Sequence, residues 1–224
     1  MLRQLLSGSM DFADVIIYIL STLTVIFLTL PIHEFAHGFA ATKLGDNTPR
    51  YQGRLTLNPF AHIDYIGSLC ILLFGFGWAK PVQVNPRNFK NSKAGMAVTA
   101  FAGPFSNIIV ALISLFLVNS TALIYSSTGL EFLVYLYYFF VYIVQINISL
   151  AVFNLIPVPP LDGSRILFAF LPNRIYYSFM RYERYITFGL FALIYTGVLD
   201  VPLANASNAI YAVLSYIANL PFGF

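Results

Sequence analysis

Three long apolar stretches, separated by polar and proline-rich segments, dominate the pattern of hydrophobic and polar positions along the chain. Residues 15–32, 94–118 and 132–155 contain no charged side chain. About 20 apolar residues in a helix are enough to cross the hydrocarbon core of a membrane. The pattern therefore predicts three spanning helices, at about 12–44, 94–118 and 132–155.

The remaining apolar stretches are shorter. Residues 67–78 are interrupted by glycines and are too short to span as a helix. Residues 161–171 predict a short helix, residues 186–199 predict a further spanning helix, and residues 206–220 are marginal in length. The four residues before Leu161 include three prolines, which forbid regular helix there. The predicted fold is thus an all-α polytopic membrane protein.

Composition supports a membrane protein and excludes other classes. Hydrophobic residues make up 58% of the chain, charged residues only 9%, and the mean hydropathy is +0.76. A soluble domain contains roughly 25% charged residues. The net charge of +3 comes from basic residues spread over several loops, which argues against a nucleic-acid partner. Cys70 is the single cysteine, so no disulfide can form within one chain.

The distribution of Lys and Arg predicts the topology. These residues gather in 45–93 and 165–184, whereas 119–129 and 200–205 contain neither. The positive-inside rule places the basic segments in the cytoplasm. Because both flanks of 67–78 are basic, that stretch is expected to enter the membrane and return on the same side. Just before it, Arg54, Leu55, Thr56 and Leu57 alternate in polarity and predict a short strand in a loop after the first helix.

The first apolar stretch ends in His33-Glu34-Phe35-Ala36-His37. On a helix, His33 and His37 are one turn apart on the same face, where two imidazoles can bind one zinc ion. Glu34 beside them can act as a general base toward water. A lone motif of this kind can also arise by chance on a helix surface. Ionisable groups in an apolar helix are costly, however, and usually mark a function.

A catalytic zinc takes three protein ligands and keeps one position for water. Most acidic residues lie in loops or at the outer ends of the predicted helices, whereas Asp162 follows the proline-rich segment after the third long helix. Asp162 is therefore the candidate third ligand, with one zinc ion expected per chain. Because Gly163 and Ser164 lead into a predicted helix, Asp162 could alternatively be a helix N-cap.

Other polar or small residues in the predicted helices have two interpretations. Gly103, Pro104 and Asn107 are equally consistent with close helix packing and with support of the active site. Asn154 and Asn147 share a helix face and could look into a catalytic cavity. The short sequence His62-Ile63-Asp64 could bind a second metal ion, although a hydrogen bond within the loop is the simpler interpretation.

The chain resembles the site-2 protease family of intramembrane zinc metalloproteases, in its compact bacterial branch without a PDZ or nucleotide-binding regulatory domain. The resemblance rests on HEFAH at 33–37, AGPFSN at 102–107 and NLIPVPPLDG at 154–163, with further similarity at 53–67 and 78–89. It implies that His33, His37 and Asp162 bind zinc and that Glu34 is the general base. It also implies a three-helix catalytic core within one membrane-embedded domain, with the core at about 10–170 and C-terminal helices at 171–224.

The resemblance further implies a substrate and a location. The expected substrate is a transmembrane segment of a membrane-anchored regulator or a remnant signal peptide, cut in a prokaryotic cell membrane with the active site toward the cytoplasm. Asn154 would lie near this substrate, and the predicted strand 54–57 would hold its unwound backbone. The lipid bilayer is the other expected partner, and association with further copies of the chain is left open. A zinc-binding pseudoprotease scaffold and an ion-coupled transporter are the alternative functions.

Overall fold

The computed structural model describes residues 11–74 and 77–223, and these residues form helices and connecting loops without a strand. The first long helical element comprises α2 (Phe12–Thr24), a π-helical turn (Val25–Thr29) and α3 (Leu30–Lys43). It covers 32 residues and is long and apolar enough to cross a membrane. The same holds for α6 (Ser92–Thr128) and α7 (Phe132–Asn154), so the predicted three spanning helices are confirmed in length and composition.

Local signals explain where α6 begins and ends. The side chain of Asn91 accepts a hydrogen bond from the Ala94 N–H at 3.1 Å and caps the first turn. Gly129 ends the helix with a φ of 65°, a left-handed conformation that glycine adopts without strain. The helix is therefore longer than the predicted 94–118, because no glycine or proline lies between Val118 and Gly129.

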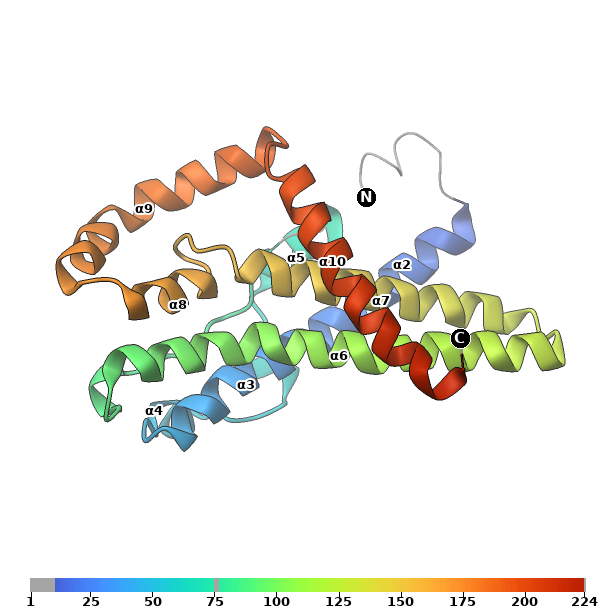
Figure 1. The fold of residues 1–224 in the computed structure, drawn as a ribbon, viewed down its shortest axis with the longest axis horizontal. Coiled ribbons are helices and arrows are strands. Elements are labelled where there is room, and N and C mark those ends of the chain that lie inside the picture. Colours follow the sequence, from blue (N-terminus) through green and yellow to red (C-terminus); the bar gives the residue numbers. More distant parts are fainter. Residues whose placement is uncertain (1–10, 75–76, 224) are drawn as a thin grey trace.

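The long helices pack around α6. In Figure 1, α6 and α7 run side by side along the long axis, α3 lies beside the first half of α6, and α10 (Asp200–Asn219) crosses over the pair. A core of buried apolar side chains from α6, α7 and α10 holds the second half together; it consists of Ala111, Leu115, Val118, Val144, Ile148, Val152, Leu214 and Ala218. The first half of α6, which is not part of this core, faces α3.

The C-terminal helices differ from their prediction. After the short α8 (Asp162–Phe170), α9 (Asn173–Tyr195) is followed by α10, and residues 181–195 and 200–222 are inclined by 84° to each other. The two parts are apolar enough only when they are taken together, as a broken span or a re-entrant loop, so the predicted separate spanning helix at 186–199 is wrong. The charged residues of α9 extend to Arg184 and leave its apolar part too short.

The segment between α3 and α6 carries short elements only: α4 (Thr48–Tyr51), α5 (Tyr65–Phe74) and single turns at Pro59–Ala61 and Pro86–Asn88. With 10 residues, α5 is about 15 Å long, half the hydrocarbon thickness. The predicted strand at 54–57 is wrong. Its polar groups form local bonds instead: the Arg54 N–H donates to Pro49 O at 2.8 Å, and His62 Nε2 lies 2.9 Å from Thr56 O.

Candidate metal centre and active site

The two histidines of α3 lie one helical turn apart and face the same point. Pro31, which has no N–H to donate, is the second residue of α3 and follows directly after the π-helical turn. His33 and His37 are both buried, with exposed fractions of 6% and 7%. Their Nε2 atoms are 2.9 Å apart. Two imidazole nitrogens are thus directed at one small volume, as the sequence predicted.

Asp162 reaches this volume from the first turn of α8. Its Oδ2 atom lies 3.3 Å from His33 Nε2 and 3.2 Å from His37 Nε2. The N-cap of α8 is Leu161, so the alternative interpretation of Asp162 as an N-cap does not hold. One carboxylate oxygen thus faces both imidazole nitrogens, and carboxylate oxygens are among the ligands that zinc binds.

The geometry fits zinc. One ligand atom from each of His33, His37 and Asp162 lies within 4.8 Å of the others, and this is the group of potential metal ligands found among the described residues. In a tetrahedral zinc site with bonds of 2.0–2.2 Å, ligand atoms are about 3.3–3.5 Å apart. The observed separations of 2.9–3.3 Å are close to that spacing. Three protein ligands are also the number that a catalytic zinc takes.

The other ring nitrogen of each histidine is bound by α6. His37 Nδ1 lies 2.7 Å from the backbone oxygen of Thr99, which can only accept, so Nδ1 carries the proton and the Nε2 lone pair is free for a metal ion. His33 Nδ1 lies 3.3 Å from Asn107 Oδ1, which gives the same tautomer. The role of Thr99 was missed from the sequence, because a backbone oxygen leaves no signal in the residue type.

Glu34 is buried beside the two histidines, with 8% of its surface exposed. Its Oε2 atom accepts a hydrogen bond from the Val82 N–H at 2.8 Å. Glu34 does not belong to the group of metal ligands. Its position in the motif and its burial suit a group that moves protons beside the metal ion.

The comparisons with known proteins agree with this site. The model of peptidase family M50 matches residues 129–196. YwhC of Bacillus subtilis, which is named as a zinc metalloprotease, is 41% identical over 174 residues, 75% of this chain and 75% of YwhC. The chain belongs to peptidase family M50. It is a zinc-dependent protease with several membrane-spanning helices, as the resemblance to site-2 proteases implied.

More distant M50 relatives carry similar names. Rip2 of Mycolicibacterium smegmatis, also named as a zinc metalloprotease, is 29% identical over 146 residues, 61% of this chain and 51% of Rip2. Rip2 of Mycobacterium tuberculosis is 27% identical over the same length. The chain thus spans about half the length of the Rip2 proteins. No solved structure matches it.

Gly103 of this M50 protease lies against both histidines. A Cβ atom added there would be 2.3 Å from His37 Nε2 and 2.6 Å from His33 Nε2. Of the two interpretations of the 103–107 segment, the structure therefore favours support of the active site for Gly103 and for Asn107. Pro104 is buried in α6 between them.

Other predicted residues lie near the site or apart from it. A Cβ on Gly38, next to His37, would be 3.7 Å from Leu55 Cδ1, so the 54–57 segment lies against the motif helix. The Asn154 side chain instead donates to Leu150 O in its own helix at 3.0 Å. Asn147 donates to Ile143 O at 2.9 Å and contacts Thr29 Oγ1 at 3.4 Å, which is an interhelical contact and not a cavity position.

The second metal site considered at His62 and Asp64 is a loop hydrogen-bond arrangement. His62 Nε2 faces Thr56 O, and Asp64 Oδ1 accepts the Gly67 N–H at 2.8 Å. Asp64 thus stabilises the start of α5.

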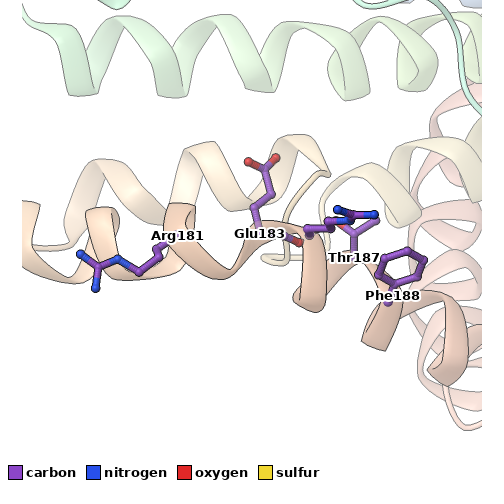
Figure 2. A pocket seen from close by; sticks show the side chains of 5 residues that line it. Arg181, Glu183, Thr187 and Phe188 are labelled. Carbon is purple, nitrogen blue, oxygen red and sulfur yellow. Dashed lines mark hydrogen bonds between the residues drawn. The ribbon is translucent and has the colours of Figure 1, made fainter.

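Two cavities lie on the side of α8 and α9. The larger, of about 980 Å³, is lined by residues of the 81–93 segment, of α6, and of α8 with the prolines before it, among them Pro160 and Ser164, which are two residues from Asp162 on either side in the sequence. The smaller, of about 440 Å³, is a shallow depression along α9 lined by Arg181, Glu183, Arg184, Thr187 and Phe188 (Figure 2). His33, Glu34, His37 and Asp162 line neither cavity.

Proposed function

We propose that this M50 protease hydrolyses peptide bonds in or near transmembrane segments, and that its substrates are membrane-anchored regulators or remnant signal peptides. The observation that carries the proposal is the position of His33 and His37. Both lie within the 32-residue apolar element that is long enough to cross a membrane, and both are buried against α6. A site at this place is accessible to a chain within the bilayer.

The roles of the side chains follow from the geometry. His33, His37 and Asp162 would hold one zinc ion, which when bound polarises a carbonyl group and lowers the pKa of water to about 7. Glu34 takes a proton from the water that attacks the scissile carbonyl carbon. As the C–N bond breaks, Glu34 returns that proton to the leaving amine. Thr99 and Asn107 keep the imidazoles in the orientation that this step needs.

Substrate access is proposed from the side of the larger cavity. The cavity of about 980 Å³ is lined by Pro160 and Ser164, which flank Asp162 in the sequence, and its volume lies in the range of ligand pockets. A helical segment has to unwind before its carbonyl groups are accessible, because they are bonded within the helix. Residues 54–57 remain a candidate contact for the unwound chain through their position beside Gly38, although they are not a strand by themselves. Asn154 remains a candidate through the resemblance.

The active site is proposed to open toward the cytoplasm. Lys43 ends α3, the segment between α3 and α6 contains Arg50, Arg54 and Lys80, and the connection between α6 and α7 contains neither Lys nor Arg. The positive-inside rule then orients the C-terminal end of α3 inward. Cysteines introduced as Asn91→Cys and Ser127→Cys, each with Cys70→Ser, test this on intact cells with a membrane-impermeant reagent. Labelling at 127 and not at 91 is expected; the reverse would invert the orientation.

The decisive experiment compares the membrane proteomes of cells with the wild-type protein and with the Glu34→Gln variant. New peptide termini within or beside transmembrane segments are expected only with the wild type. Their amounts in the variant should equal those in cells without the protein. Cleavage products confined to soluble proteins, or equal products from both forms, would refute the proposal.

A further inference from the structure

Residues 80–89 pass beside α3, the helix that carries His33 and His37. Two buried carboxylates accept hydrogen bonds from the backbone of this segment. One is Glu34, which accepts the Val82 N–H at 2.8 Å. The other is Asp46, which accepts the Asn85 N–H at 2.7 Å. The segment ends at Phe89, which is buried against Gly95 of α6, where a Cβ would be 2.4 Å from the Phe89 ring. The segment is thus fixed at three points between α3 and α6.

Asp46 is the strongest of these anchors. Its side chain is fully buried and accepts further hydrogen bonds from the Thr48 N–H at 3.0 Å, the Thr48 hydroxyl and the Asn88 side-chain amide at 2.7 Å. Its own N–H donates to Ala41 O at 2.9 Å, in the last turn of α3. Asp46 therefore joins the end of the motif helix to segment 85–88. A buried carboxylate with this many donors is well satisfied and rigid.

The contact at Val82 occupies one oxygen of Glu34. Oε2 accepts the Val82 N–H, and this hydrogen bond favours one orientation of the carboxylate. The Val82 side chain is itself buried and lies close to α3, since a Cβ on Gly38 would be 3.6 Å from Val82 Cγ1. The backbone at 82 is therefore held in place by packing on one side and by the Asp46 anchor on the other.

We propose that Asp46 is a positioning residue for Glu34 and acts through the backbone of residues 82–85. Asp46 fixes Asn85, the short extended segment sets the direction of the Val82 N–H, and that N–H aims the free oxygen of Glu34 at the attacking water. The inference rests on the proposed role of Glu34 as the general base. A group displaced by about 1 Å from its productive geometry can lose on the order of 10²-fold in rate.

Steady-state kinetics with purified zinc-loaded protease and a membrane-protein substrate cut by the wild type test the inference. Val82→Pro removes the N–H, while Val82→Ala keeps it. Asp46→Ala removes the anchor, and Asp64→Ala is the matched control, a loop carboxylate that also accepts a backbone N–H. Val82→Pro and Asp46→Ala are each expected to lower kcat by about 10- to 100-fold with KM changed less than twofold. Val82→Ala should lower kcat less than Val82→Pro does, because it keeps the N–H, and Asp64→Ala should stay within threefold of the wild type.

The double variant Asp46→Ala/Val82→Pro tests whether Asp46 acts on Glu34 through Val82, a relay, or whether the two residues affect kcat independently. A relay predicts that kcat of the double variant is no lower than that of Val82→Pro alone, because the two residues act on Glu34 through one contact. Multiplication of the two single effects would overturn the inference. So would a loss of zinc content in Asp46→Ala as large as its loss of kcat, because Asp46 would then act on the metal centre and not on Glu34.

Hydrogen exchange followed by mass spectrometry provides a readout apart from activity. In Asp46→Ala, amides within 82–85 should exchange faster than in the wild type, while Asp64→Ala leaves them unchanged. Unchanged exchange in Asp46→Ala would overturn the inference, as would faster exchange with wild-type kcat. Glu34→Gln is measured in parallel: full turnover in that variant would refute the proposed function itself, whereas its inactivity beside a fully active Asp46→Ala refutes only the relay.

Discussion

The two halves of α6 use one row of buried residues for different purposes. Every fourth residue from Gly95 to Leu115 is buried, and the series reads Gly95, Thr99, Gly103, Asn107, Ala111 and Leu115. At 3.6 residues per turn, such a row winds slowly around the helix, so its two ends face different neighbours. The first four positions are small or polar: Gly95 lies against Phe89 of the connecting segment, and the next three contact His33 or His37 of α3. The last two are apolar and join the core with α7 and α10. The first half of the row thus supports the metal centre, and the second half stabilises the helix packing.

This difference predicts which property of the protein a substitution at each end of α6 should change. At the polar end, a substitution changes the position of a few atoms around the metal centre. At the apolar end, it changes packing along a helix interface. Variants at the first end should therefore affect zinc binding and turnover, and variants at the second should affect stability with turnover retained.

The largest effect is expected for His37→Ala at the polar end. It removes one of three metal ligands, so zinc content should fall from about one per chain to near zero, and cleavage should be lost. Metal analysis of the purified protein and a cleavage assay measure both. Phe39→Ala, on the same helix but exposed, is the control and should keep its zinc. Unchanged zinc in His37→Ala would contradict the assignment of the site.

Glu34→Gln should abolish turnover and leave the metal in place. General-base catalysis contributes roughly 10²–10⁴ in rate, so a loss of at least that size is expected. Zinc content and melting temperature should match the wild type, because Glu34 is not a ligand. Appreciable cleavage by this variant would show that another group moves the proton.

Gly103→Ala should lower both zinc affinity and turnover by about 10- to 100-fold. The added methyl group would lie 2.3 Å from His37 Nε2, so helix α6 or the imidazoles have to shift. A competition assay with a zinc chelator measures the affinity. Ala111→Gly, two turns further along the same row, opens space instead and should leave the affinity unchanged. If both variants lowered the zinc affinity equally, the expected difference between the two halves of α6 would be wrong.

Leu115→Ala tests the apolar end. Truncating a buried leucine costs about 2–5 kcal/mol in the free energy of unfolding. Leu115 is 3% exposed within the core of α6, α7 and α10, so the melting temperature in detergent should fall, while kcat stays near that of the wild type. Leu117→Ala, at an exposed position of the same helix, should hardly change it. A selective loss of zinc in Leu115→Ala would contradict the division of α6.

The smallest effect is a pH dependence at the polar end. Burial opposes the charged form of Asp46, but hydrogen bonds from Thr48, Asn85 and Asn88 outweigh it and lower the pKa of this carboxyl below its usual value of about 3.9. A lowered folded-state pKa stabilises the protein above the unfolded pKa, and the contribution is lost as pH falls below about 4. Asp46→Asn should therefore melt lower at pH 7 and show a shallower decline toward pH 3. Parallel curves would exclude this linkage.

Local features of the sequence determined much of the site. The spacing of His33 and His37 corresponds to about one helical turn, and the prolines before Asp162 prevent a regular helix there. Helix length and apolar character likewise predicted the three spanning elements correctly. These features depend on neighbouring residues only, so the sequence was enough to propose the metal ligands and the zinc chemistry.

Tertiary contacts decided the rest. Thr99 acts through a backbone oxygen, and Gly103 acts through the absence of a side chain, so neither shows its role in its residue type. The role of Asp46 as an anchor leaves no signal in the sequence, because its partners Asn85 and Asn88 are about 40 positions away. The alternation at 54–57 predicted a strand, but a strand needs a neighbouring strand, and the described chain supplies none. The sequence by itself determined which groups could do chemistry, and only the packing of α6 against α3 decided how they are held, because that depends on which distant backbone atoms meet.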